Sequence, residues 1–250
     1  MASDISSSRT AIVTGGAKRI GAEIVRALAA DGWHVLIHYN HSRAEAEALA
    51  AEIGSASLVQ AELGDPGAAD AVMAATSGLP PPRLLVNNAS RFVHDDLRDF
   101  TVAGWDETLD VNLRAPALLT RAFAATAVEG LIVNLLDAKL AAPNPDFFSY
   151  TMTKIGLAGL TELSARALAP DFRVCGIAPS VTLVSGPQSR ENFDEVHDLN
   201  ALGRGVEVAE IVAALRFIIA APSLTGQTIL LDGGQRFLSL PRDVQFLEPK

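Results

Sequence analysis

The 250-residue sequence has a single cysteine, no long apolar run and fewer basic than acidic residues. The lone cysteine, Cys175, excludes an internal disulfide framework. The most apolar late stretch, residues 212–221, is interrupted by Arg216 and is too short to span a bilayer. The first ten residues, MASDISSSRT, contain no apolar segment of the secretory type. These absences predict a soluble protein of a reducing compartment, most simply the cytoplasm.

The charge balance limits the partners that we expect. Lys and Arg total 20 against 29 Asp and Glu, which gives a net charge of -9 and a pI of about 5.0. Nucleic acids and anionic membrane surfaces are therefore poor partners. The five histidines show no metal-ligand spacing, so we expect no metal site. Hydrophobic residues make up 49% of the chain, which is enough for a substantial core.

Short apolar runs alternate along the chain with longer amphipathic stretches. The runs are apolar on both faces, which is typical of parallel strands covered by helices. The alternation predicts an α/β fold, a doubly wound parallel sheet with helices on both faces, in a single domain over residues 1–250. The predicted strands are residues 10–14, 34–39, 56–61, 83–88, 130–136, 172–178 and 227–232. The predicted helices are residues 21–30, 42–53, 67–76, 104–126, 149–169 and 206–218.

The longest stretch without clear periodicity is residues 182–205. It is polar and follows a predicted strand end, which is where open α/β sheets bind their ligands. We interpret it as a mobile substrate loop. A plain surface excursion is the alternative.

The segment TGGAKRIG, residues 14–21, follows a predicted strand and opens a predicted helix. Gly15 suits the tight turn, and Gly21 allows close packing of helix on strand. The start of the helix offers free N–H groups and a positive dipole end to a pyrophosphate. Arg19 adds a full positive charge where a second close-approach glycine often stands. A helix-entry turn without a ligand is the alternative.

The end of the second predicted strand indicates which dinucleotide binds. A free ribose 2′-hydroxyl favours an Asp or Glu near this point, but none occurs before Glu45. His38, His41, Ser42 and Arg43 are instead donors suited to a 2′-phosphate. This pattern favours NADPH over NADH. Ser42 is also a candidate helix N-cap, and the two roles are compatible.

Tyr150 and Lys154 lie four positions apart, on one face of a predicted helix. An ammonium group near a phenol lowers the pKa of the phenol toward neutrality, and a tyrosine with such a pKa can give a proton to a substrate. An isolated pair of this kind is more often a surface feature. Here it follows the nucleotide turn, NNASRF (residues 87–92) and Asn112 in order.

Together these motifs resemble the short-chain dehydrogenase/reductase family, from about Thr10 to Gly234. The resemblance rests on TGGAKRIG, NNAS, Asn112, Tyr150, Lys154, Ala178-Pro179 and TGQTILLDGG. It implies a Rossmann-type seven-stranded sheet, a nicotinamide cofactor and a homotetramer. It also implies that Tyr150 is the acid, that Lys154 tunes it and holds the nicotinamide ribose, and that Asn112 supports a water-linked proton relay.

Asp137 is the main departure from this family pattern. The family usually has a serine there, about thirteen residues before the tyrosine, which donates a hydrogen bond to a carbonyl. An ionised aspartate only accepts hydrogen bonds, so simple ketone reduction is disfavoured. Either the pocket keeps Asp137 protonated, or the substrate presents donors and a basic atom. A fold that has lost its activity is the third alternative.

The departures resemble one subgroup, the pteridine reductases and their bacterial dihydromonapterin and dihydrofolate reductase relatives. That resemblance implies a pterin or folate-like substrate, contacted by Arg19, Ser90, Phe92, Asp137 and Tyr150, with Phe92 stacked on the ring. An ordinary hydrophobic anchor is the alternative for Phe92, and a turn cap for Ser90. The implied cofactor-binding residues are Gly15, Arg19, Ile20, Gly21, His38, His41, Ser42, Arg43, Glu62, Leu63, Asn88, Ala89, Ser90, Tyr150, Lys154 and Pro179.

Three functions remain open at this point. The first is NADPH-dependent reduction of a C=N bond in a pterin, dihydropterin or dihydrofolate. The second is reduction of another carbonyl or imine, with Asp137 facing an amine-bearing ligand. The third is a non-catalytic NADPH-binding sensor, which has no need for both Tyr150 and Lys154. The apolar residues of the C-terminal tail, FLSLPRDVQFLEPK, are candidates for packing against a neighbouring subunit.

Overall fold

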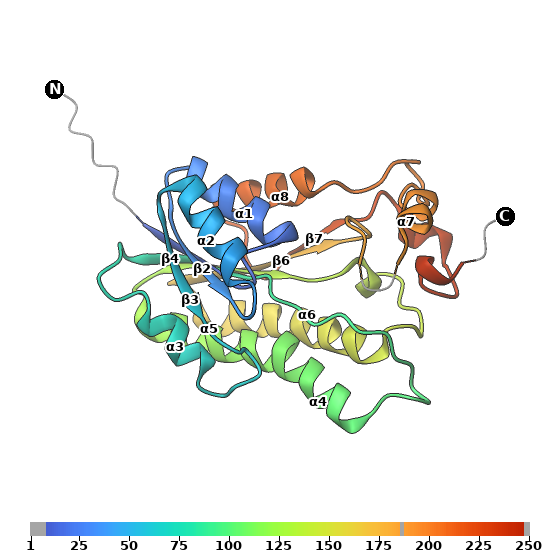
Figure 1. Cartoon of the computed structure of the whole chain (residues 1–250), viewed down its shortest axis with the longest axis horizontal. Coiled ribbons are helices and arrows are strands. Elements are labelled where there is room, and N and C mark those ends of the chain that lie inside the picture. Colours follow the sequence, from blue (N-terminus) through green and yellow to red (C-terminus); the bar gives the residue numbers. More distant parts are fainter. Residues whose placement is uncertain (1–8, 186–187, 248–250) are drawn as a thin grey trace.

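The computed structural model describes residues 9–185 and 188–247 and contains a parallel sheet of seven strands. The strand order is β3-β2-β1-β4-β5-β6-β7, so the order reverses between β1 and β4. Figure 1 shows the strands lying between an upper and a lower set of helices. This arrangement confirms the predicted Rossmann-type doubly wound sheet. The strands are β1 (Thr10–Val13), β2 (His34–Tyr39), β3 (Ala56–Gln60), β4 (Pro82–Asn87), β5 (Gly130–Leu135), β6 (Phe172–Pro179) and β7 (Thr228–Leu231).

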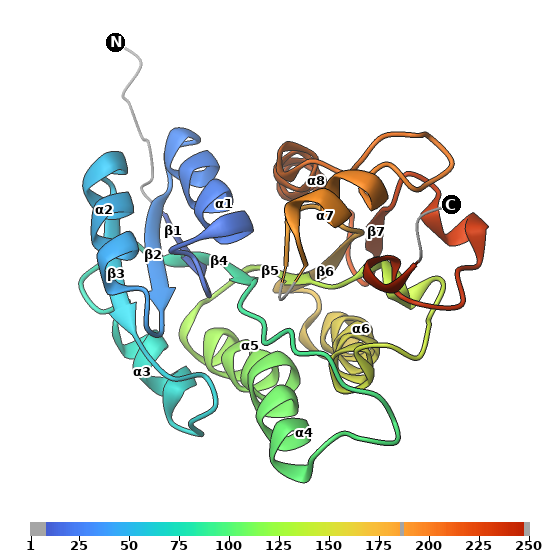
Figure 2. The ribbon, with the colours of Figure 1, turned by 45° about the vertical axis from the view of Figure 1, so that its right-hand side comes forward.

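Helices cover both faces of the sheet (Figure 2). One layer contains α1 (Arg19–Ala30), α2 (Arg43–Ile53) and α8 (Val208–Ala220). The opposite layer contains α3 (Ala68–Ala74), α4 (Val102–Leu109), α5 (Ala115–Thr126) and α6 (Phe148–Leu168). No helix within residues 9–185 and 188–247 combines the length and the apolar composition that a membrane span requires.

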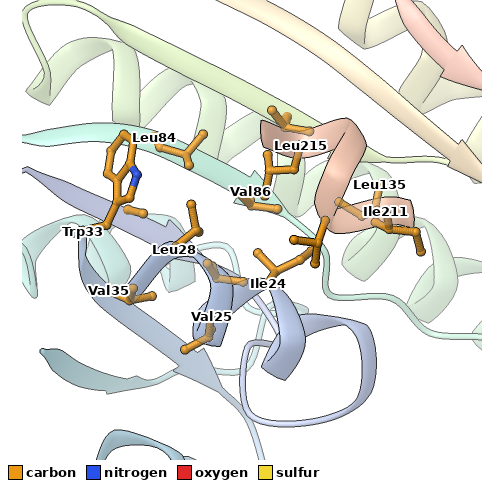
Figure 3. Close-up of a cluster of buried hydrophobic side chains, with 14 of the residues drawn as sticks. Ile24, Val25, Leu28, Trp33, Val35, Leu84, Val86, Leu135, Ile211 and Leu215 are labelled. Carbon is orange, nitrogen blue, oxygen red and sulfur yellow. The ribbon is translucent and has the colours of Figure 1, made fainter. Parts of the chain in front are cut away.

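The core has two halves, one on each side of the sheet. In β1, Ala11 and Val13 pack toward α1, whereas Ile12 packs toward α5, because successive strand side chains point to opposite faces. Figure 3 shows the first half, in which Leu28 of α1 and Leu215 of α8 lie over the strands. Burial on both faces explains why the strand sequences are apolar without alternation.

The predicted helix over 104–126 is divided in the structure, which corrects that prediction. Between α4 and α5 lies a π-helical turn, η1 (Asp110–Arg114). Asn112 is buried within it, at 1% exposure, and its amide bonds to the backbone of Arg91. Such turns often occur at functional sites, where they turn one side chain out of register.

The predicted substrate loop also contains regular structure. Within residues 182–205, α7 (Arg190–Val196) begins after Ser189, whose hydroxyl accepts a hydrogen bond from the Asn192 N–H. Residues 186–187 lie outside the described part of the chain. The region is therefore not a continuous irregular loop. Near it, the tail forms two short 3-10 turns, η3 (Gln235–Leu238) and η4 (Val244–Phe246), and packs on its own chain next to α7.

Candidate functional site

A pocket of about 740 Å³ lies at the carboxyl ends of the strands, where the strand order reverses. It brings together nearly all of the predicted site residues. Arg43 and Asn112 are the two that do not line it. The predicted residues that do are Gly15, Arg19, Ile20, Gly21, His38, His41, Ser42, Glu62, Leu63, Asn88, Ala89, Ser90, Phe92, Asp137, Tyr150, Lys154 and Pro179.

The glycine-rich turn after β1 has the geometry of a phosphate cradle. Gly15 has a φ of 60°, which favours glycine. A Cβ at Gly21 would lie 2.2 Å from the Gly15 carbonyl oxygen and 2.7 Å from Asn88 Nδ2. The N-cap of α1, Lys18, makes no side-chain capping bond, so the first N–H groups of the helix face the pocket without that competitor. The turn can therefore hold an anionic group at close range.

Arg19 adopts an unusual conformation within this turn. Its φ of 55° lies in the left-handed region, which costs a non-glycine residue about 1 kcal/mol. Its guanidinium crosses the pocket mouth, where Nη1 donates to the Val184 carbonyl at 2.7 Å. Arg19 thus connects the phosphate turn to the loop after β6.

His38 has a different role from the one expected. Its Nδ1 accepts from the Gly15 N–H at 3.1 Å, and its Nε2–H donates to the Ala61 carbonyl at 3.1 Å. Burial lowers the pKa of His38, which keeps the ring neutral. Both ring nitrogens are used within the protein, so His38 orients the turn and is not a donor to a 2′-phosphate.

Of the other predicted residues after β2, His41 and Ser42 line the pocket and Arg43 lies beside it at the start of α2. His41 and Arg43 are exposed, and Arg43 pairs with Glu47 at 3.4 Å. Ser42 stands at the N-cap of α2, as predicted, but makes no side-chain capping bond. Lys18, which our sequence prediction missed, lines the pocket here with its charge paired to Glu45 at 2.7 Å. Its place inside TGGAKRIG was the available signal.

The pocket floor joins Asp137 to Tyr150. The Tyr150 hydroxyl donates to Asp137 Oδ2 at 2.8 Å, and the Lys139 N–H donates to Asp137 Oδ1 at 2.8 Å. Lys154 Nζ donates to the Leu135 carbonyl at 2.7 Å and lies 5.4 Å from the centroid of the Tyr150 ring. This geometry agrees with the prediction from the sequence that Asp137, Tyr150 and Lys154 lie together.

Burial controls the acid–base behaviour of this floor. It raises the pKa of Asp137 above its ordinary value, although the neighbouring hydrogen bonds and lysines oppose that shift. Burial and the adjacent carboxyl also raise the pKa of Tyr150, so the expected lowering toward neutrality is wrong for this structure. Burial lowers the pKa of Lys154 to about 8. The pair of Asp137 and Tyr150 therefore stays protonated at pH values at which an isolated carboxyl group has lost its proton.

Asn112 supports the site from behind the pocket. Its Oδ1 accepts from the Arg91 N–H at 2.7 Å, and its Nδ2 donates to the Arg91 carbonyl at 2.9 Å and to Thr153 Oγ1 at 3.2 Å. These bonds fix the segment after β4 to α6. Since this geometry uses both ends of the amide, the structure gives Asn112 a positioning role.

An aromatic cluster forms one wall of the pocket. Phe92 stacks on Phe147 with ring centroids 4.1 Å apart and meets the Tyr150 ring edge-on at 4.7 Å. Phe147 is fully buried and was not predicted from the sequence. Ser90 is exposed at the rim.

The C-terminal segment, residues 240–247, lines the pocket beside this aromatic cluster, where Phe246 stacks on Phe147 with ring centroids 5.9 Å apart, and it was also missed. Arg242 binds both carboxylate oxygens of Asp146 at 2.7–2.9 Å, and Lys139 pairs with Asp243 at 2.9 Å. Five of its residues line the pocket: Leu240, Arg242, Asp243, Val244 and Gln245. Within residues 9–185 and 188–247, no group of three or more His, Cys, Asp or Glu side chains could hold a metal ion.

Comparisons with known proteins agree with this geometry. The family model for short chain dehydrogenases matches residues 9–195. The crystal structure of FolM alternative dihydrofolate reductase 1 from Brucella canis, complexed with NADP, superposes with a TM-score of 0.88. It is 39% identical and covers 93% of this chain and 95% of its own.

Two curated relatives show the range of substrates among similar proteins. Pteridine reductase 1 of Leishmania tarentolae is 31% identical over 90% of this chain and 95% of its own length. L-xylulose reductase of Mesocricetus auratus is 32% identical over 90% of this chain and 96% of its own.

Proposed function

This chain belongs to the short chain dehydrogenase family, and we propose that it is an NADPH-dependent reductase of a C=N bond in a pterin, dihydropterin or dihydrofolate. One observation carries the proposal. A carboxyl that lines the pocket, Asp137, accepts a 2.8 Å hydrogen bond from Tyr150 where the family usually has a serine donor. A carboxyl and a phenol that retain protons suit the protonation of a ring nitrogen.

The residues present fit NADPH. The turn at Gly15 and Gly21 leaves no room for a side chain between helix and strand, which keeps the first N–H groups of α1 at the pocket, where a pyrophosphate would bind. Lys18 and His41 line the pocket and supply positive or donor groups for a 2′-phosphate, and the exposed Arg43 follows them at the start of α2. When bound, NADPH supplies a hydride.

The protein's own groups then manage the proton. As the carbon of the C=N bond gains the hydride, its nitrogen gains a proton from the Asp137–Tyr150 pair, and solvent restores that proton afterwards. Lys154, with its pKa of about 8, contributes positive charge beneath the phenol at neutral pH. Phe92, which contacts the rings of Phe147 and Tyr150, offers a stacking surface for a flat ring. Ser90 and Arg19 lie at the rim and mouth, in reach of cofactor phosphate or substrate edge.

A carbonyl substrate is the second candidate, and the similarity to L-xylulose reductase favours it. The two functions differ in what Asp137 must do. A ketone requires a donor at that position, and a carboxylate is a donor only while protonated. Ketone reduction should therefore fall more steeply with rising pH than pterin reduction.

NADPH consumption by the purified protein tests these functions directly. We expect oxidation of NADPH with dihydropterins or dihydrofolate and little with simple ketones. NADH serves as the matched cofactor control and should support slower turnover. Turnover of ketones without turnover of any pterin would reject the proposal, and NADPH binding without any turnover would favour a sensor.

We further propose a single domain over residues 1–250, a cytoplasmic location and a homotetramer. The one sheet with its two helix layers supports the single domain. The buried free thiol of Cys175 is compatible with a reducing compartment. Exposed apolar side chains along α6 support an assembly of subunits.

A further inference from the structure

Lys139 is a buried lysine in the pocket wall that the proposed reaction does not use. Its ammonium donates to Asn144 Oδ1 at 3.0 Å and to the Asp146 carbonyl at 2.8 Å, and it pairs with Asp243 Oδ2 at 2.9 Å. The Lys139 and Asp243 side chains are each only 10% exposed. Burying such a pair is costly unless further hydrogen bonds complete its surroundings, as they do here.

The same residue also holds the catalytic carboxyl. The Lys139 N–H donates to Asp137 Oδ1 at 2.8 Å within the short turn η2 (Ala138–Leu140). Lys139 thus binds Asp137 through its backbone and Asp243 through its side chain. It links the C-terminal segment, residues 240–247, to the proton-donating pair.

We propose that Lys139 and Asp243 are a positioning pair that fixes the C-terminal segment to the Asp137 turn and sets the charge acting on the Asp137 carboxyl. The inference rests on the proposed function, in which that carboxyl takes part in proton donation. Asp146 strengthens the attachment, because its carboxylate binds Arg242 and the Asp243 N–H of the same segment.

The charges around Asp137 determine in which direction each substitution shifts the protonation of its carboxyl. The titratable groups that face it are Tyr150 and Lys154 from α6 and Lys139 from its own turn, and Asp243 from the C-terminal segment is paired with Lys139. The two lysines favour the ionised carboxyl, and Asp243 partly cancels Lys139. Removing the charge of Lys139 should therefore favour neutral Asp137, whereas removing the charge of Asp243 should favour the carboxylate.

The experiment compares Lys139→Met, Asp243→Asn and the double variant in the full-length protein. The pH profile of kcat/KM for dihydropterin reduction by NADPH is the readout. We expect the alkaline limb to move up by at least about half a pH unit in Lys139→Met and down in Asp243→Asn, with the double variant near the unaltered protein. Lys139→Arg, which keeps the positive charge, should retain the original profile. Arg166→Gln is the matched control, because it removes one member of an exposed ion pair on α6, and it should leave the profile unchanged.

A second measurement does not depend on turnover. Carbon NMR of aspartate-labelled protein with NADP bound follows the Asp137 carboxyl, which is assigned by its loss in Asp137→Asn. We expect its pKa to move in opposite directions in the two single variants. If Lys139→Met does not fold, Lys139→Gln, which keeps a donor for Asn144, replaces it.

The outcomes separate this inference from the proposed function. Shifts in the same direction, or no shift in folded variants that bind NADP, overturn the positioning pair, since a merely structural role changes stability without opposite signs. Opposite NMR shifts in a protein that reduces no pterin support the pair and reject the proposed function. Pterin turnover with unshifted pH profiles supports the proposed function and rejects the positioning pair.

Discussion

At the scale of single residues, the pocket shows why spacing predicts contact better than it predicts chemistry. Four positions on a helix correctly predict that Tyr150 and Lys154 share a face. The pKa of Tyr150 depends instead on burial and on Asp137, and both raise it. Burial is a property of the folded chain, so the sequence pattern alone led to the opposite direction. His38 differs from expectation for the same reason, because its partners come from two other segments.

Asp137→Asn and Tyr150→Phe should each lower kcat for the pterin substrate at least about tenfold. Each change removes an acidic proton from the hydrogen-bonded pair while preserving most of its volume. Dissociation constants for NADPH, measured by fluorescence, should stay near those of the unaltered protein. In that protein, kcat/KM should fall as pH rises through the raised pKa of the pair, because the donated proton is lost. Undiminished turnover in Asp137→Asn would show that the carboxyl is incidental.

Arg19→Gly separates the charge of this residue from its backbone strain. Glycine accepts a φ of 55° without the cost of about 1 kcal/mol that other residues incur. We therefore expect the free energy of unfolding to be maintained or raised, while NADPH binding weakens about tenfold through loss of the guanidinium. Arg19→Ala, the matched control, should weaken binding equally but keep the strain. Equal unfolding energies in the two variants would contradict the strain argument.

At the scale of elements, the strands were predictable and the division of one helix was not. Burial on both faces makes the strands apolar throughout, and this local signal needs no tertiary knowledge. The π turn at η1 arises because Asn112 bonds to the backbone of Arg91, 21 positions away. The helical periodicity of the sequence does not depend on that contact and therefore could not predict the π turn. The helix α7 was missed because seven residues are too few to establish a period.

Gly21→Ala tests the packing of α1 on the phosphate turn. Its new Cβ would lie 2.2 Å from the Gly15 carbonyl oxygen, so the helix must move away from β1. We expect a loss of about 1–3 kcal/mol in the free energy of unfolding by urea, together with weaker NADPH binding. Gly67→Ala, at an exposed position where a Cβ meets nothing within 4 Å, should change stability by less than about 0.5 kcal/mol. Equal effects of the two substitutions would reject the close-packing role.

At the scale of the whole molecule, the pocket is closed by segments that lie far apart in the sequence. The turn at Arg19 reaches Val184, and Arg242 reaches Asp146, 96 positions away. The family resemblance ended near Gly234, and the tail has no periodicity, so its place in the pocket wall was not predictable. Residues 240–247 pack on the pocket of their own chain, whereas packing of the tail's exposed apolar residues, such as Phe237, on a neighbouring subunit stays a prediction.

The exposed face of α6 leads to a prediction about assembly. Met152, Ile155 and Leu163 are 42%, 45% and 67% exposed, and their spacing places them in one stripe along the helix. A stripe of this kind is costly to leave in water and suits burial against the same helix of a second copy. The double variant Ile155→Glu/Leu163→Glu should therefore sediment as smaller species than the unaltered protein. Val128→Glu, at a position 83% exposed in a loop, is the matched control and should not change the sedimentation coefficient. A stripe variant that assembles normally would show that subunits meet elsewhere, because two buried glutamates facing their copies would repel one another.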